Sequence, residues 1–221
     1  MKLIPEWYEH QYCLIAWPCN KDLYGKIINK ARDEVANVIN EIAKTEHVIV
    51  LSNKEDINEI QNKTDHKNID IVECKLDDSW MRDIAPIFYN EDEKLKSISF
   101  EFNGYGKYPD YLNDNKISKF ISNYLNIPTK ISDLVIEGGA ITYDDKKNLF
   151  STKNVIFNKN RKQKHNSEYI IKELKLLFNL NYIFLFENGL MEDDTDGHVD
   201  NLLCPIAVSY THLRAHETSN H

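Results

Sequence analysis

The chain has 221 residues, of which 42% are hydrophobic and 28% are charged, a composition typical of a globular protein with a substantial core. The formal net charge is -8 with acidic and basic residues interspersed, which argues against nucleic acid as a partner. No apolar run approaches the roughly 18 residues that a membrane span needs, and charged residues and Pro5 come too early for a signal peptide. We therefore expect a cytoplasmic protein that does not interact with a membrane.

The N-terminal part of the chain predicts strands and helices in alternation. Cys13–Pro18, Val48–Leu51 and Ile69–Val72 are short apolar runs that indicate buried strands. Residues 26–44 predict a helix, and residues 52–55 (Ser-Asn-Lys-Glu) have the pattern of a capping box that opens a second, short helix. The buried stripe expected on the first helix consists of Ile27, Ala31, Val35, Val38, Ile39 and Ile42.

From residue 87 onward the pattern changes to short strands in pairs. Strands are expected at Ile87–Tyr89, Ser97–Phe102, Leu134–Ile136, Ala140–Tyr143, Leu149–Thr152 and Tyr182–Phe186, and helices at 115–125 and 166–179. This order fits a strand-strand-helix-strand repeat, and no low-complexity linker marks a domain boundary. The sequence therefore predicts a single α/β domain.

Four cysteines, at positions 13, 19, 74 and 204, form no C-x-x-C pair and no zinc-ribbon spacing. We expect them to be free, buried thiols in a reducing compartment.

A first group of chemically active residues lies in Trp80-Met81-Arg82-Asp83, between a strand and Pro86. A tryptophan beside alternating charges at a strand end is typical of a binding site, although a solvated acidic loop would also place carboxylates here. A second group is Glu137-Gly138-Gly139, where a carboxylate ends an apolar strand and the glycines allow close backbone approach. A plain turn would explain the same residues.

The third group is residues 193–201 (Asp-Asp-Thr-Asp-Gly-His-Val-Asp-Asn). If His198-Val199-Asp200 is extended, the imidazole and the carboxylate point to the same side because strand side chains alternate. A polar strand edge is the alternative. The acidic residues imitate the start of a calcium loop, but Leu203 stands where the bidentate glutamate is required, so no metal site is expected.

Together the three segments supply Asp83, Glu137, His198 and Asp200. Converging carboxylates match a planar guanidinium cation, which presents a fork of N–H donors. An imidazole in the same pocket can carry protons near neutral pH.

These segments resemble the agmatine deiminases and the bacterial-type peptidyl-arginine deiminases of the guanidine-modifying (pentein) superfamily. The resemblance rests on residues 80–86, Glu137-Gly138-Gly139 and residues 194–201. Pro5-Glu6-Trp7, Ala16-Trp17-Pro18 and the segment from Asn158 to Arg161 are also similar to this family.

The resemblance implies a five-bladed α/β propeller of ββαβ units and the hydrolysis of agmatine to N-carbamoylputrescine and ammonia, within putrescine synthesis. It implies that Asp83 and Asp200 hold the guanidinium, that His198 is the general acid and base, and that Glu137 orients His198. Trp80 and Asp196 are expected to contact the substrate. No metal or organic cofactor is implied, and the full-length protein is expected to form a homo-oligomer.

The family's nucleophilic cysteine lies in a glycine-Asn-Ile-His-Cys type segment near the C-terminus, and this chain contains no such segment. We nominate none of the four cysteines, and we expect residues 1–204 to be the N-terminal part of one deiminase domain, with an incomplete propeller. Residues 209–218 resemble a translated adapter peptide, so residues 205–221 are expected to be a non-native tail, and a frayed native terminus is the alternative. Protein-arginine citrullination and guanidinium binding without turnover remain the alternative functions.

Overall fold

The computed structural model describes residues 1–65 and 67–206 and has a mixed α/β fold. Its strands are β1 (Lys2–Leu3), β2 (Cys13–Ala16), β3 (Val48–Ser52), β4 (Ile69–Glu73), β5 (Ile87–Glu91), β6 (Lys94–Glu101), β7 (Thr129–Val135), β8 (Thr142–Tyr143), β9 (Asn148–Thr152) and β10 (Tyr182–Phe186). Its α-helices are α1 (Lys21–Tyr24), α2 (Ile28–Ile42), α3 (Ile57–Lys63), α4 (Met81–Ile84), α5 (Ile117–Tyr124), α6 (Lys153–Ile156) and α7 (Ser167–Phe178). The predicted strands and helices are present, with shifted bounds at two strands. The strand expected at Ala140–Tyr143 is only Thr142–Tyr143, and the one expected at Leu134–Ile136 is the end of β7.

The chain divides into two compact units, each with its own sheets. Among the described residues the first unit contains 1–8, 82–109 and 118–206, and the second contains 9–65, 67–81 and 110–117. The prediction that residues 1–204 belong to a single domain stays a prediction. Residues 207–221, most of the expected non-native tail, lie outside the described residues.

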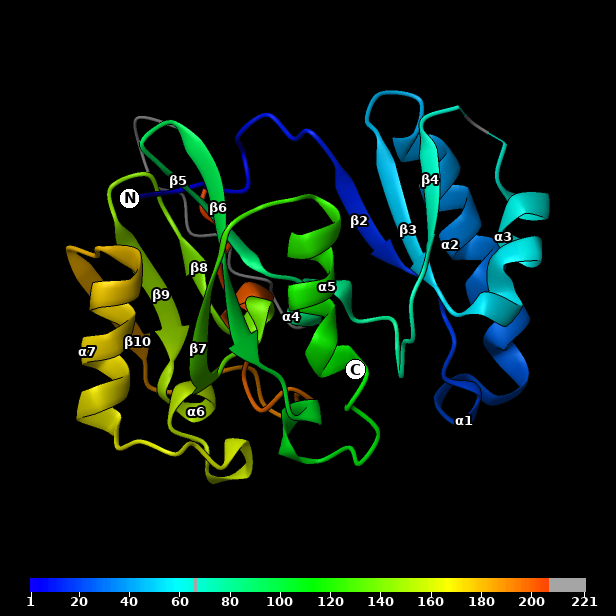
Figure 1. The fold of residues 1–221 in the computed structure, drawn as a ribbon. Coiled ribbons are helices and arrows are strands. Elements are labelled where there is room, and N and C mark those ends of the chain that lie inside the picture. Colours follow the sequence, from blue (N-terminus) through cyan, green and yellow to red (C-terminus); the bar gives the residue numbers. More distant parts are fainter. Residues whose placement is uncertain (66, 207–221) are drawn as a thin grey trace. The chain divides into compact units, whose positions relative to one another are not determined.

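The second unit is a parallel sheet of order β2-β3-β4, and Figure 1 shows α2 and α3 beside it. Val48 to Ser52 of β3 are all buried, as an apolar central strand requires. Ala36 and Ile39 of α2 pack with Val48 and Val50 in its core. The predicted order of strand, helix, strand, helix and strand is confirmed.

Two local expectations in this unit are wrong. Ile27 and Val38, expected on the buried stripe, are 62% and 52% exposed, because the buried face of α2 is turned toward Arg32, Ala36 and Ile39. The capping box does not form, since the Ser52 hydroxyl donates to the carbonyl of Asn53 and caps no helix.

The first unit contains two successive groups of strand, strand, helix and strand, as the spacing predicted. In one group β5 pairs antiparallel with β6, and β6 pairs parallel with β7 after α5. In the other β8 pairs antiparallel with β9, and β9 pairs parallel with β10 after α7. Asp92 and Glu93 join β5 to β6 with positive φ angles, which suit a two-residue hairpin turn.

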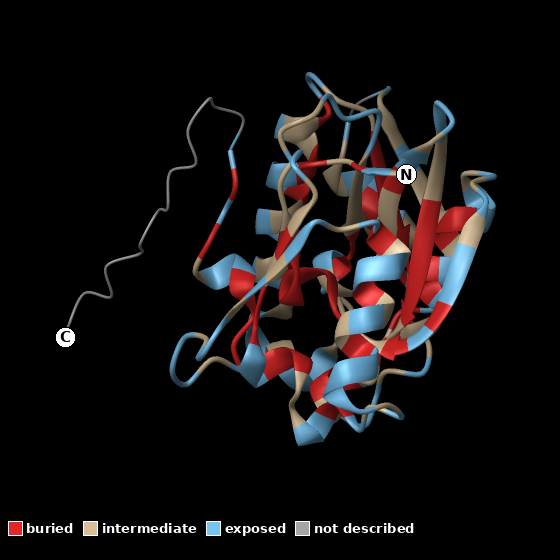
Figure 2. Cartoon of the chain, turned by 90° about the vertical axis from the view of Figure 1, so that its left-hand side faces the viewer, coloured by how far each residue is buried: buried red, intermediate tan, exposed pale blue. Residues whose placement is uncertain are grey.

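One apolar core holds these two groups together. Phe178 of α7 packs against Phe100 of β6, with ring centroids 5.9 Å apart, and Leu134 of β7 and Leu149 of β9 are both fully buried in the same cluster. Figure 2 shows the buried residues along the strands and on the inner faces of the helices, and the exposed residues on the outer faces.

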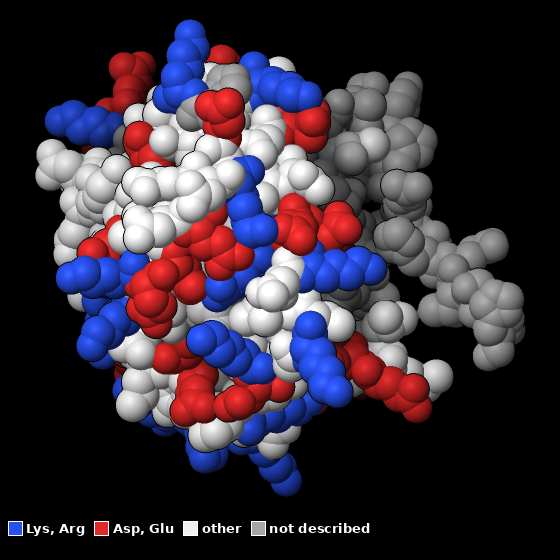
Figure 3. Space-filling view, turned by 90° about the vertical axis from the view of Figure 1, so that its right-hand side faces the viewer, with Lys and Arg blue, Asp and Glu red and all other residues white. Residues whose placement is uncertain are grey.

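The described parts of both units contain no helix long and apolar enough to cross a membrane. Figure 3 shows acidic and basic side chains intermingled on one face.

Candidate active site

Asp83, Glu137, His198 and Asp200 come together around Gly139 in the first unit. Asp83 lies on α4, Glu137 directly precedes the 3-10 turn Gly138–Ala140, and Asp200 lies in the 3-10 turn Val199–Asn201. A Cβ atom on Gly139 would lie 2.5 Å from Nδ1 of His198, 2.6 Å from Oδ2 of Asp200 and 2.9 Å from Oδ1 of Asp83. Glycine is therefore required for these three side chains to converge.

His198 is buried between two carboxylates. Its Nδ1 atom lies 3.7 Å from Oδ1 of Asp83, and its Nε2 atom lies 3.5 Å from Oε2 of Glu137. Burial works against protonation, but the Glu137 and Asp83 carboxylates outweigh it and raise the pKa of His198 above its ordinary value. Nε2 therefore faces Glu137, whereas Nδ1 faces the point beside Gly139 where the Asp83 and Asp200 carboxylates converge.

The Asp83 carboxylate is fixed by two donors. The backbone N–H of Gly139 donates to Oδ1 at 2.8 Å, and the Tyr105 hydroxyl donates to Oδ2 at 2.7 Å. Each oxygen keeps further acceptor capacity, so Asp83 can still receive N–H donors from a cation.

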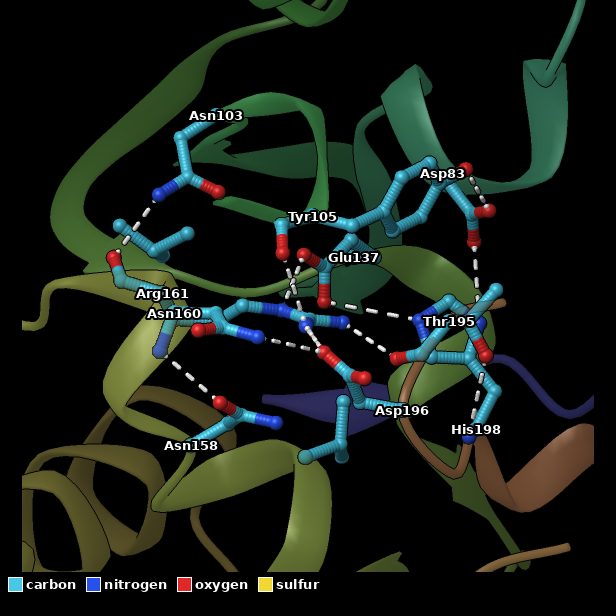
Figure 4. A network of polar contacts seen from close by, with 12 residues as sticks. Asp83, Asn103, Tyr105, Glu137, Asn158, Asn160, Arg161, Thr195, Asp196 and His198 are labelled. Carbon is cyan, nitrogen blue, oxygen red and sulfur yellow. Dashed lines mark hydrogen bonds and ion pairs between the residues drawn. The ribbon is translucent and has the colours of Figure 1, made fainter. Parts of the chain in front are cut away.

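Glu137 is held from behind by Arg161, as Figure 4 shows. Nε of Arg161 donates to Oε1 of Glu137 at 2.9 Å, and the two side chains are 0% and 1% exposed. Burial would raise the pKa of Glu137, but His198 and the Arg161 charge outweigh it and hold that pKa below its ordinary value. Glu137 thus remains a carboxylate beside His198.

Arg161 connects three segments of the first unit. Its Nη1 atom donates to the Tyr105 carbonyl at 3.0 Å and to Oδ2 of Asp196 at 2.8 Å, and Nη2 donates to the Thr195 carbonyl at 2.6 Å. The sequence singled out Arg161 only as the end of a family-like segment. A buried arginine cannot be recognised from its type, because arginine is mostly exposed in proteins.

Asp196, expected to contact the substrate, is paired with cations of the chain itself. Oδ1 lies 2.5 Å from Nζ of Lys107, and Oδ2 accepts from Arg161 and from the Asn160 amide. Burial is outweighed by Lys107 and the other partners, so the pKa of Asp196 is lowered. These contacts tie the loop after residue 193 to Arg161, and contact with substrate stays a prediction.

The segment His198-Val199-Asp200 is a turn, so the expectation of an extended strand is wrong. The loop that leads into this turn is fixed by Asp193, because its carboxylate accepts from the backbone N–H groups of Thr195, Gly197 and His198 at 3.1, 2.9 and 3.1 Å. His198 and Asp200 still approach the same point, but through a 3-10 turn. The signal that could have found this turn is Asp193-Asp194-Thr195, since an aspartate often accepts from the N–H two residues later.

Asp200 lies beside Arg82 at the exposed side of the site. Nε of Arg82 is 3.7 Å from Oδ2 of Asp200, and Nη2 of Arg82 is 2.5 Å from Oε1 of Glu6. Partial burial raises the pKa of Asp200, while His198 and Arg82 counteract that rise.

Trp80 belongs to the second unit, so its placement against these four side chains stays a prediction. It is 47% exposed, and its Nε1 atom donates to Oδ2 of Asp78 at 2.9 Å. The Asn20 amide donates to the same oxygen at 3.3 Å and fixes it.

The four cysteines are free thiols, as expected, but none is fully buried: Cys13, Cys19 and Cys74 are partly buried. Burial raises the pKa of Cys19 and of Cys74 to about 12, and it raises the pKa of Cys13 as well. These three residues are therefore thiols at neutral pH and poor nucleophiles. Cys204 is exposed.

Comparison with known proteins gives a consistent picture. A family model described as Porphyromonas-type peptidyl-arginine deiminase matches residues 2–220. A protein of Mycoplasma capricolum, provisionally named an agmatine deiminase, is 33% identical over 214 residues, which cover 94% of this chain and 58% of that protein. The chain thus spans about three-fifths of the length of the curated relatives it matches.

Solved structures share the fold. A cysteine-to-serine variant of agmatine deiminase from C. jejuni with substrate bound matches with a TM-score of 0.82 and 28% identity, over 91% of this chain and 60% of that one. Agmatine deiminase of Enterococcus faecalis matches with a TM-score of 0.85 over 91% of this chain and 57% of that one, and its 20% identity supports the fold alone.

Proposed function

Because the chain belongs to the family of Porphyromonas-type peptidyl-arginine deiminases, we propose that its buried cluster binds a guanidinium group and serves the hydrolysis of agmatine to N-carbamoylputrescine and ammonia. The observation that carries this proposal is the convergence of Asp83, His198 and Asp200 on Gly139. Similarity to proteins named agmatine deiminase supports agmatine as the substrate.

In the proposed complex Asp83 and Asp200 accept the N–H groups of the guanidinium. A carboxylate and a guanidinium match in geometry, and the paired hydrogen bonds orient the cation as well as hold it. The fixed orientation of Asp83 favours this role, because an ordered carboxylate loses little entropy when it binds.

In the proposed reaction a cysteine thiolate attacks the guanidinium carbon, and His198 gives a proton to the departing nitrogen so that ammonia leaves. The remaining S-alkylthiouronium is then attacked by a water molecule, from which His198 takes a proton. The carbon–sulfur bond breaks, and N-carbamoylputrescine and the thiolate are released. Glu137 and Arg161 hold the imidazole between the reacting groups.

We assign the thiolate to none of the four cysteines. The raised pKa values of Cys13, Cys19 and Cys74 disfavour the anionic form that the reaction needs. We therefore propose that the nucleophile belongs to a part of the propeller that residues 1–221 do not include. The two ββαβ groups support this five-bladed fold.

Calorimetry with agmatine, together with an ammonia-release assay, tests this proposal on the 221-residue chain. We expect agmatine to bind without release of ammonia, and Asp83→Asn to reduce the affinity more than tenfold because it removes a charge-assisted contact. Asp145→Asn, which changes an exposed aspartate in a turn, is the matched control and should bind normally. Equal binding by the wild-type protein and Asp83→Asn would contradict the proposed site, and ammonia release at an enzymatic rate would contradict the assignment of the thiolate.

The description of the family favours a second candidate, arginine within a peptide. Agmatine ends in an amine where a peptide offers backbone amides. A blocked arginine amide in the same calorimeter separates the two, and tighter binding of the blocked arginine than of agmatine would favour the peptide substrate.

A further inference from the structure

The turn that carries Tyr105 has an unusual backbone. Gly104, Tyr105 and Gly106 have φ angles of +63°, +58° and +69°. The glycines adopt this region freely, but a bulky residue does so only when the surroundings hold it there, and such positions cluster at functional sites.

The surroundings of Tyr105 hold both its backbone and its ring. Nη1 of Arg161 donates to the Tyr105 carbonyl at 3.0 Å. The ring packs edge-on against Phe102, with centroids 5.3 Å apart, and its centroid lies 5.7 Å from Cζ of Arg161. Tyr105 is 5% exposed, so its hydroxyl has one fixed direction.

That direction leads into the site. The Tyr105 hydroxyl donates to Oδ2 of Asp83 at 2.7 Å, and its ring centroid lies 5.8 Å from that of His198. Tyr105 therefore contacts both Asp83 and His198, whose Oδ1 and Nδ1 atoms lie 3.7 Å apart. Its carbonyl accepts from Arg161, the residue that holds Glu137.

We propose that Tyr105 is a positioning residue that orients the Asp83 carboxylate toward a guanidinium and sets its distance from His198. The proposal rests on the proposed function of the site. Without the hydroxyl, the Gly139 N–H is the one hydrogen-bond donor left to Asp83 within residues 1–65 and 67–206, and the carboxylate can rotate about it.

Tyr105→Phe is a clean test, because phenylalanine keeps the ring and removes only the hydroxyl. A hydrogen bond to a charged group contributes more free energy than one between neutral groups. We therefore expect agmatine to bind about tenfold more weakly to Tyr105→Phe. Tyr182→Phe, on the exposed strand β10, is the control and should bind like the wild-type protein.

A second readout needs no ligand and separates positioning from packing. The imidazole of His198 is titrated by NMR in the wild-type protein and in both variants. The groups facing it are Asp83, Glu137 and Asp200, with Arg161 behind Glu137 and Arg82 beside Asp200, and neither variant changes any of them. In Tyr105→Phe the Asp83 carboxylate is no longer held near Nδ1 of His198 and stabilises the imidazolium less, so we expect His198 to titrate at a lower pH than in the wild-type protein.

The two readouts distinguish the possible failures. An unshifted His198 titration and unchanged agmatine affinity in Tyr105→Phe would overturn the role of Tyr105 alone. If the wild-type protein does not bind agmatine, the proposed function fails, and the titration of His198 by itself decides whether Tyr105 positions Asp83.

Discussion

At the scale of single residues, the site depends on a buried cation of the chain itself, Arg161. Arg161 is completely buried and pairs with the buried carboxylate of Glu137, which would otherwise have only the His198 imidazole beside it among the described residues. Removing one partner of a buried ion pair is costly because the other charge stays in a poorly solvating interior. An ion pair at the surface contributes little, since water already solvates both partners.

Arg161→Met should therefore lower the free energy of unfolding by about 3–5 kcal/mol, measured by urea denaturation. The matched control is Lys153→Met, which removes the cation of an exposed pair with Glu187 and should cost at most about 1 kcal/mol. Similar losses in both variants would contradict a structural role for Arg161 beneath Glu137.

His198 makes stability depend on pH. Its pKa in the folded protein lies above the ordinary value of 6.5, so the stabilising contribution of its protonated form is fully present below pH 6.5. It is lost as the pH rises through the raised value. We expect the free energy of unfolding to fall over this window in the wild-type protein and to fall less in His198→Gln. Parallel pH profiles of the two proteins would show that folding does not stabilise the protonated imidazole of His198.

Residue types explain which side chains the sequence could reveal. Asp83, Glu137, His198 and Asp200 lie within about three residues of glycine, tryptophan or proline in short polar segments, and this context marked them before the fold was known. Tyr105 lies between two glycines, which predict a turn and not a site. The importance of Tyr105 and of Arg161 comes from contacts across 22 and 24 positions of the chain, which the local sequence does not show.

At the scale of elements, short turns rather than regular strands carry the site. Asp83 lies on the single helical turn α4, and the other groups lie in or beside two 3-10 turns. The strand expected at residues 198–200 was wrong because the side-chain hydrogen bonds of Asp193 satisfy the backbone locally and compete with a strand. Long apolar runs such as β3 were predictable, since burial on both faces leaves a clear signal in the sequence.

Gly139→Ala should disturb the site without unfolding the unit. Its Cβ atom would meet His198, Asp200 and Asp83 at less than 3.0 Å, so these side chains must move apart. We expect agmatine affinity, measured by calorimetry, to fall more than tenfold, as for loss of a charged hydrogen bond.

Gly25→Ala is the control for this substitution. Nothing lies within 4 Å of its Cβ position, although its φ of +51° makes alanine strained. This variant should lose roughly 1–2 kcal/mol of stability and keep normal agmatine binding. If Gly139→Ala bound agmatine as tightly as Gly25→Ala, close approach at Gly139 would not be needed for binding.

At the scale of the whole molecule, the sequence predicted the repeat of strand, strand, helix and strand but not the division into two compact units. The repeat was visible because each group contains short apolar runs for its strands and one segment with apolar residues at helical spacing. The division was not visible, because residues 110–117 return to the second unit through contacts such as that of Asp77 with Asn113. No linker in the sequence marks that return.

The most direct test of the central claim is a crystal structure of the chain with agmatine. We predict that the guanidinium lies next to Gly139, hydrogen-bonded to Asp83 and Asp200, with its carbon beside the His198 imidazole. A guanidinium bound elsewhere, while Asp83 and Asp200 keep their present contacts, would contradict the proposed site.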